Sequence, residues 1–109
     1  MSVLKGHCQC GAVTVEAQSA GPGLTACHCD MCRRLSSGAF ISFEVDPASA
    51  KIEGPVRLRQ TSEWAERGFC TECGTPVLYR AGSLLKLSAG LFEDTGLTLE
   101  TEFFGDKRP

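Results

Sequence analysis

The sequence lacks the features of a membrane protein, a secreted protein and a nucleic-acid-binding protein. No apolar run reaches the roughly 18 residues that a membrane-spanning helix needs. The first residues, Met-Ser-Val-Leu-Lys-Gly-His, lack the apolar centre of a signal peptide, so we expect a cytoplasmic protein. Basic residues are outnumbered, with 11 Lys and Arg against 13 Asp and Glu, and the net charge of −2 argues against a nucleic-acid partner.

The sequence also lacks internal repeats, low-complexity segments and any linker long enough to separate two domains. A length of 109 residues supports one hydrophobic core, so we expect a single domain over residues 1–109. Hydrophobic residues make up 42% of the chain and charged residues 22%. This balance is typical of a globular domain and argues against a disordered chain.

Cysteine is the residue in excess, with seven in 109 residues. Structural disulfides are rare in a reducing compartment, and pairing an odd number leaves one thiol over. The spacing favours metal binding instead, because close pairs place two thiolates on one tight turn, able to face one ion. A Cys-x-Cys pair is also poorly suited to the demanding geometry of a disulfide. The seven fall into three clusters: Cys8-x-Cys10, Cys27-x-Cys29-x-x-Cys32 and Cys70-x-x-Cys73.

Seven thiolates divide into a site of four and a site of three. A structural zinc takes four protein ligands, whereas a catalytic zinc takes three and keeps one position open. The central cluster of Cys27, Cys29 and Cys32 matches the catalytic pattern. The outer pairs match the structural pattern and would join distant parts of a small domain. We therefore expect two zinc ions per chain, the structural one held by Cys8, Cys10, Cys70 and Cys73.

Other interpretations of the cysteines stay open from the residues alone. His7 or His28 would complete the central site and make both zinc ions structural. A disulfide framework is a second alternative. Iron would also suit the four-cysteine site, although zinc is the usual metal of thiolate sites without redox chemistry. An iron–sulfur cluster is the least favoured, because the spacing resembles no ferredoxin pattern.

Outside these clusters the sequence predicts short strands of alternating hydrophobic and polar residues, separated by Gly-rich turns. This pattern is typical of a mainly β, antiparallel domain. The expected strands cover residues 13–17, 39–44, 56–59, 76–79, 85–89 and 97–103.

Helical patterns are scarce. Residues 30–36 predict one or two turns with Asp30 as the N-cap, and residues 46–49 predict one more with Pro47 at the first helical position. Gly11 and Gly74 directly follow two of the cysteine pairs, where a turn often requires a positive φ.

Five motifs together resemble a known family. They are Gly6–Val13, Cys27–Arg34, Gly38–Phe40, Arg67–Val77 and Ser88–Asp94. The sequence resembles the glutathione-dependent formaldehyde-activating family, also called the centromere protein V/formaldehyde-activating family. The match runs in order from Gly6 to about Phe104, and several spaced motifs in one order are far more specific than a single Cys-x-x-Cys pair.

The resemblance implies a fold, an activity and two sets of ligands. The fold is the β-tent, or Mss-four-like, fold, in which antiparallel sheets are joined by a four-cysteine zinc site. The activity is that of a carbon–sulfur lyase, which reversibly adds a thiol such as glutathione to formaldehyde or another small aldehyde. By resemblance, Cys27, Cys29 and Cys32 are the ligands of the catalytic zinc. The structural zinc ligands are matched by Cys8, Cys10, Cys70 and Cys73.

A zinc held by three thiolates carries a formal charge of −1. This makes it a weak Lewis acid and suits it to hold a substrate thiol as the thiolate. We expect that thiolate to attack an aldehyde carbon, and the oxygen that gains negative charge then needs a hydrogen-bond donor. Candidate donors are the N–H groups near Ser36-Ser37-Gly38 and the side chains of Arg33 and Arg34.

Further residues have two interpretations each. Trp64 either lines a pocket or packs elsewhere, Phe40 is expected in the core, and His28 is either a proton shuttle or a histidine hydrogen-bonded to backbone. Four arginines suit the carboxylates of glutathione, although a solvated surface charge is the simpler interpretation of each. They are Arg33, Arg34, Arg59 and Arg67.

Two rival functions remain from the sequence. The first is a non-catalytic, zinc-stapled binding module for a small thiol or a protein partner, since fold does not determine function. Such a module needs only the four-cysteine site and leaves the central cluster unexplained. The second is a thiol redox enzyme like the B-type methionine sulfoxide reductases. That chemistry needs a reactive cysteine free of metal, and every cysteine here belongs to a cluster.

Overall fold

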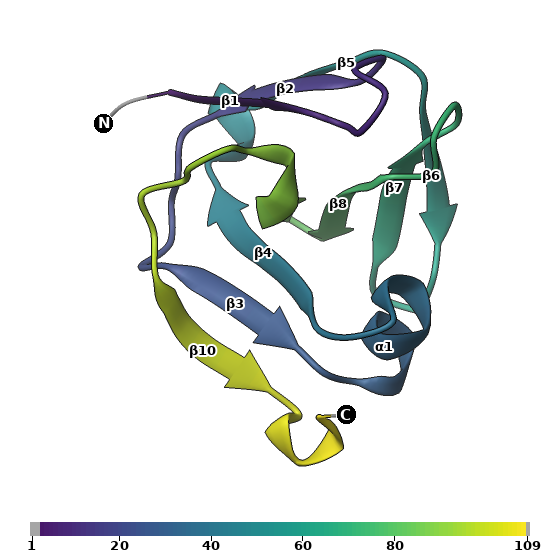
Figure 1. Ribbon diagram of the computed structural model, residues 1–109, viewed down its shortest axis with the longest axis vertical. Coiled ribbons are helices and arrows are strands. Elements are labelled where there is room, and N and C mark those ends of the chain that lie inside the picture. Colours follow the sequence, from purple (N-terminus) through teal and green to yellow (C-terminus); the bar gives the residue numbers. More distant parts are fainter. Residues whose placement is uncertain (1–2, 109) are drawn as a thin grey trace.

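The computed structural model describes residues 3–108 and is mainly β, as the sequence predicts (Figure 1). Four short helical turns interrupt the strands in this range: α1 (Asp30–Ser36), η1 (Pro47–Ser49), η2 (Ala89–Leu91) and η3 (Gly105–Lys107). The strands are β1 (Leu4–His7), β2 (Thr14–Ala17), β3 (Leu24–Cys27), β4 (Phe40–Val45), β5 (Lys51–Glu53), β6 (Val56–Gln60), β7 (Glu66–Cys70), β8 (Pro76–Ala81), β9 (Leu84–Ser88) and β10 (Leu99–Phe103).

The strands form two sheets. The small sheet has the order β1-β2-β5, and the large sheet has the order β10-β3-β4-β9-β8-β7-β6. Neighbouring strands are antiparallel, as expected, except for β10, which pairs in parallel with β3 at one edge of the large sheet. In Figure 1 the small sheet lies at the top of the molecule, and β3, β10 and the C-terminal turn lie at the bottom.

All six expected strands are present, with ends that shift by up to two residues. Strands β1, β3 and β5 were not predicted because they have only three or four residues, and β7 was not predicted because its sequence does not alternate. In β7, for example, Arg67, Gly68 and Cys70 are all buried, so both faces of the strand pack against other parts of the chain. A strand covered on both faces has no polar face to reveal its period.

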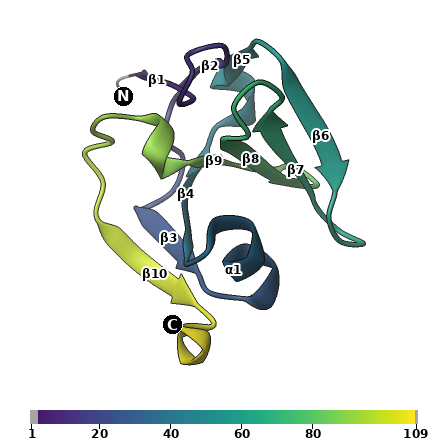
Figure 2. The ribbon, with the colours of Figure 1, turned by 45° about the vertical axis from the view of Figure 1, so that its right-hand side comes forward.

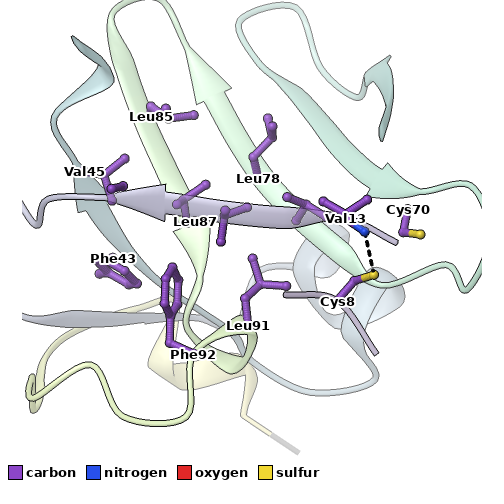
Figure 3. Close-up of a cluster of buried hydrophobic side chains, with 13 residues drawn as sticks. Cys8, Val13, Phe43, Val45, Cys70, Leu78, Leu85, Leu87, Leu91 and Phe92 are labelled. Atoms are coloured by element: carbon purple, nitrogen blue, oxygen red, sulfur yellow. Dashed lines mark hydrogen bonds between the residues drawn. The ribbon is translucent and has the colours of Figure 1, made fainter. Parts of the chain in front are cut away.

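The hydrophobic core lies between the two sheets and extends to the outer cysteine pairs. Phe43 and Phe92 pack edge to face, with ring centroids 5.3 Å apart and ring planes at 65°. Figure 3 shows Cys8 and Cys70 at the opposite end of this cluster from Phe43. The four-cysteine cluster therefore continues the core of a small domain, in which apolar burial alone is limited.

Helix α1 lies beside β3 and β4 (Figure 2) and covers the predicted residues 30–36, but its N-cap differs from the prediction. The N-cap is Cys29, not Asp30, because the Cys29 backbone is extended and its Sγ accepts a hydrogen bond from the Cys32 N–H over 3.4 Å. Asp30 occupies the first turn, where its negative charge stabilises the helix by interacting with the positive end of the helix dipole. The thiol of Cys29 thus occupies the capping position that a side-chain oxygen usually takes.

The other turn predictions are confirmed. Pro47 opens η1, which Asp46 caps by accepting a hydrogen bond from the Ala48 N–H over 3.0 Å. Gly11 and Gly74 have φ values of 82° and 79°, which a side chain would strain. Within residues 3–108 no helix combines the length and the apolar character needed to cross a bilayer.

Candidate metal centres and the adjoining cavity

The outer cysteine pairs meet although about sixty residues separate them in the sequence. All four Sγ atoms, those of Cys8, Cys10, Cys70 and Cys73, lie within 4.8 Å of one another. The Cys8 and Cys10 sulfurs are 3.6 Å apart, and the Cys10 and Cys70 sulfurs are 3.8 Å apart. Four sulfurs at about 2.3 Å from a tetrahedral zinc would be about 3.8 Å from one another, so this cluster fits zinc.

Each outer pair sits on a tight turn that aims both thiols inward. The Gly11 N–H donates to the Cys8 carbonyl over 3.1 Å, and the Gly74 N–H donates to the Cys70 carbonyl over 2.8 Å. The Val13 N–H also donates to Cys8 Sγ over 3.3 Å (Figure 3). Hydrogen bonds of this kind stabilise thiolates and hold them in place for a metal.

The ionisation of this cluster is uneven among its thiols. A hydrogen bond with the Thr75 hydroxyl, 3.1 Å away, lowers the pKa of Cys73 to about 5. At Cys10 the Ala12 N–H lowers the pKa, but burial and the neighbouring thiols together outweigh it and raise the pKa to about 12. Four crowded thiols therefore do not all ionise by themselves, and a divalent cation compensates the charge that they share when they do.

The central cysteines form a second cluster, at the junction of β3 and α1. The Sγ atoms of Cys27, Cys29 and Cys32 lie within 4.8 Å of one another. Cys27 ends β3, Cys29 caps α1, and Cys32 lies in the first turn of α1. Within the described range, no further His, Cys, Asp or Glu joins this group. Three thiolates at this spacing fit a zinc with one ligand position left for a small molecule.

Neither histidine is brought into the central cluster. His28 is buried, and its Nε2–H donates to Glu102 Oε1 on β10 over 2.9 Å, so the ring is held toward the C-terminal edge. The hydrogen bond from His28 lowers the pKa of Glu102. His7 donates from Nδ1 to the Cys8 carbonyl over 2.7 Å. The interpretation in which a histidine closes the central site therefore has no support in the geometry.

A cavity of about 480 Å³ opens onto all three central cysteines. Aromatic side chains form much of its wall, including Phe40, Tyr79, Trp64 and Phe103. No Asp or Glu lines the cavity, as judged from the part of the chain that the structure describes, whereas Arg67 and Lys86 do. A largely apolar pocket with a few polar groups beside a reactive centre is the usual form of a small-molecule site.

Arg67 is the main correction to the sequence analysis. A solvated surface charge was the simpler expectation, but the side chain is only 8% exposed. Its Nη2 donates to Cys32 Sγ over 3.2 Å, and its guanidinium carbon lies 5.0 Å from the ring centroids of both Phe40 and Tyr79. Two aromatic faces stabilise the buried cation, and the thiol gives it a hydrogen-bond partner.

The other predicted site residues lie further out. Arg33, Arg34 and Arg59 are exposed and do not line the cavity, as the surface interpretation predicts. Phe40 is buried as expected, but it lines the cavity as well. Trp64 is 64% exposed and lies at the cavity wall.

Sequence reasoning missed three residues of this region. Lys86 is at a polar position of the alternating strand β9, so the sequence does not distinguish it from a solvated surface lysine. Tyr79 and Glu102 likewise acquire their partners, Arg67 and His28, only through sheet pairing. A fold with the correct strand order is needed to find them.

Burial and neighbouring charge act on the central thiols in opposite directions. Burial and the two neighbouring thiols raise the pKa of Cys32 to about 12, although Arg67 lowers it. Burial also raises the pKa of Cys29, but hydrogen bonds from the Cys32 N–H and from its fellow thiols outweigh burial and lower it. Cys29 is thus easier to ionise than Cys32, and a bound cation would favour ionisation of the Cys32 thiol as well.

Comparisons with known proteins agree with this arrangement. An uncharacterized lyase of Schizosaccharomyces pombe is 34% identical over 80 residues, which cover 72% of this chain and 58% of that protein. The chain thus matches little more than half of the length of this relative. A crystal structure of a Rhodobacter sphaeroides protein has the same fold, with a TM-score of 0.74 at 21% identity over 92% of this chain and 99% of that one. The model of the glutathione-dependent formaldehyde-activating enzyme family matches residues 3–106, and the chain belongs to this family.

Proposed function

We propose that this chain is a zinc-dependent carbon–sulfur lyase that reversibly adds a thiol to formaldehyde or another small aldehyde. The observation that carries the proposal is the three-thiol cluster at the wall of an apolar cavity. The family and the lyase relative support a lyase-type enzyme. Glutathione is the thiol that the family description suggests, and a cavity of about 480 Å³ is in the range for a ligand of that size.

The two clusters suit different roles. Cys8, Cys10, Cys70 and Cys73 would hold a structural zinc, because four thiols close a tetrahedron and leave no position for substrate. The central cluster would hold the catalytic zinc through Cys27, Cys29 and Cys32. When bound there, the zinc would keep a substrate thiol ionised at neutral pH. Seven thiols that must stay reduced to bind metal also suit a reducing cytoplasm, where we place the protein.

The residues around the central cluster prepare the cavity for this chemistry. The aromatic wall limits the access of water, which would otherwise compete for the aldehyde. Arg67 places a positive charge beside Cys32 and offsets part of the excess negative charge of three thiolates. Glu102 fixes the His28 ring, and thereby the backbone between Cys27 and Cys29.

A metal assay combined with a screen of thiol–aldehyde pairs tests the proposal. The wild-type protein should hold two zinc ions and accelerate hemithioacetal formation above the uncatalysed rate. The Cys29→Ser variant should keep its fold, hold one zinc and show no acceleration. One tightly held zinc and no turnover with any pair would instead indicate a binding module. A thiol that alkylates rapidly in the zinc-loaded protein would indicate redox chemistry.

A further inference from the structure

Arg67 lines the cavity, and one nitrogen of its guanidinium has no hydrogen-bond acceptor within residues 3–108. Nη2 is engaged by Cys32 Sγ, but the buried Nη1 has no hydrogen-bond partner within residues 3–108. A buried guanidinium N–H that stays unpaired is costly, and such groups are generally satisfied by water or by a ligand. Because Arg67 lines the cavity, a molecule bound beside the guanidinium is a candidate partner for this buried donor.

The Arg67 guanidinium is held in one position by the residues around it. The guanidinium is enclosed between the faces of Phe40 and Tyr79, which come from β4 and β8. The bond from Nη2 to Cys32 also fixes the rotation of the group. A donor that is held in place before the reaction needs no reorganisation when charge develops, which is the condition for effective electrostatic catalysis.

The charge around this donor favours an anionic oxygen. The described lining of the cavity contains two cations, Arg67 and Lys86, and no carboxylate. Lys86 donates to the Thr25 hydroxyl over 3.3 Å and lies 5.3 Å from the ring centroid of Phe103, and it has no hydrogen bond to a central cysteine within residues 3–108. Arg67 is therefore the cation with both an unused donor and direct contact with the cysteine cluster.

We propose that Nη1 of Arg67 donates to the aldehyde oxygen as that oxygen gains negative charge, which makes Arg67 a catalytic residue. This inference rests on the proposed function and identifies the oxyanion donor of the reaction. The thiolate sulfur gives an electron pair to the carbonyl carbon, a C–S bond forms, and the C=O π pair moves onto oxygen. Water then supplies the proton that completes the hemithioacetal. The hydroxide that remains combines with the proton that the thiol released when it ionised. Arg67 keeps its own protons throughout.

The geometry favours the reacting oxygen over a distant carboxylate of the substrate. The two terminal nitrogens of a guanidinium are only about 2.3 Å apart, so an atom held by Nη1 lies beside the nitrogen that contacts Cys32. The substrate carbon that reacts must also lie next to this cluster. The glycine and glutamate carboxylates of glutathione are several bonds away from its sulfur. Lys86, which lines the cavity and has no hydrogen bond to a central cysteine within residues 3–108, suits them better.

Kinetics of Arg67→Gln with two thiols separate these roles. Glutathione carries carboxylates and 2-mercaptoethanol carries none. If Arg67 donates to the aldehyde oxygen, kcat should fall by about 10²–10³-fold with both thiols. The dissociation constant of S-methylglutathione should stay the same. It can be measured by the fluorescence of Trp64, which is the single tryptophan and lines the cavity. A loss confined to glutathione, seen in KM and in S-methylglutathione binding, would overturn the proposal. Arg34→Gln removes an exposed arginine of α1 and should leave all these values unchanged.

Binding of formate tests the same donor without turnover. Formate presents a small anionic oxygen to the zinc-loaded protein, and its affinity should fall at least about tenfold in Arg67→Gln but not in Arg34→Gln. Equal affinities in Arg67→Gln and wild type would overturn the proposal. If the wild-type protein shows no turnover, the proposed function fails, and the formate result alone then decides whether Nη1 is an anion donor.

A second variant serves if Arg67→Gln loses zinc or fails to fold. Arg67→Lys keeps a positive charge between the two rings, but a single ammonium group cannot reproduce the planar fork that serves Cys32 and the substrate together. We expect kcat to fall by about tenfold with both thiols while the zinc content stays at two. A wild-type kcat with both thiols would overturn the proposal.

Discussion

Arg67 on β7 donates a hydrogen bond to Cys32 on α1 across 3.2 Å, and this contact joins β7 to the three-cysteine cluster. The same strand ends at Cys70, a member of the four-cysteine cluster. One short strand therefore contributes to both candidate metal centres. The four-cysteine cluster lies at the end of β7, and β7 positions the cation that contacts the three-cysteine cluster.

Loss of the four-cysteine site should affect the fold more than loss of the central one. Cys70 is fully buried in the core, so Cys70→Ser would remove a zinc ligand and place a hydroxyl among apolar side chains. We expect the free energy of unfolding, measured by urea denaturation, to fall by several kcal/mol and the structural zinc to be lost. Cys29→Ser is the control, and equal destabilisation by the two changes would mean that the central zinc is structural as well.

Substitution of Gly54 should destabilise the turn beside the first cysteine pair. Its φ is +113°, and a Cβ at this position would overlap the carbonyl oxygen of Ala12. Gly54→Ala should therefore cost about 2 kcal/mol or more in urea unfolding. Gly82→Ala is a matched control, because Gly82 also has a positive φ of +60° but open space around it. A similar cost at both positions would show that backbone strain alone, and not the contact with Ala12, sets the effect.

The hydrogen bond between His28 and Glu102 should make the stability depend on acid pH. The hydrogen bond from His28 lowers the pKa of Glu102 in the folded chain below its ordinary value of 4.5. The pair therefore stabilises the fold fully above pH 4.5, and its contribution is lost as pH falls below 4.5 through the lowered pKa. Glu102→Gln should lower the Tm at pH 7, and its difference from wild type should shrink below pH 4.5.

Glu100 lies on the same strand and gives the matched control for that titration. Its carboxylate is exposed and accepts a hydrogen bond from Thr98. Glu100→Gln should leave the Tm close to the wild-type value across the pH range. If the Tm difference of Glu102→Gln did not change with pH, the His28–Glu102 pair would not be the source of the stabilisation.

Lys86 should determine which thiols bind, and not how fast they react. Its ammonium lines the cavity and has no carboxylate partner within 4.0 Å in the described range. In Lys86→Gln we expect KM for glutathione to rise about tenfold, with kcat unchanged and with KM for 2-mercaptoethanol unchanged. An equal change with both thiols would assign Lys86 to the chemical step or to the packing of the cavity.

Spacing was enough to predict the two cysteine clusters, because metal ligands on tight turns leave a local pattern in the sequence. Strands with one polar face, such as Val56–Gln60, were likewise readable from alternation. The N-cap of α1 was misassigned to Asp30, since oxygen side chains are the usual caps and the competing role of Cys29 is visible only in the folded chain.

The burial of Arg67 and its contact with Cys32 could not be predicted from the sequence, for a different reason. Tyr79 is brought to Arg67 by the pairing of β8 with β7, and Phe40 lies on β4 of the same sheet, so neither ring is near Arg67 in the sequence. A buried arginine and a solvated arginine have the same local signature when the strand that carries them does not alternate. The cavity, which collects residues from most of the large sheet, shares this dependence on tertiary structure.

Exchange of ¹³C-labelled formaldehyde with its glutathione adduct, followed by NMR at equilibrium, tests the central claim most directly. The rate of exchange between the two carbon signals reports catalysis in both directions and does not depend on a coupled assay. The account predicts exchange well above the uncatalysed rate with the zinc-loaded wild-type protein, and the uncatalysed rate with a folded Cys29→Ser variant that keeps its four-cysteine zinc. Equal exchange rates for the two proteins would contradict it.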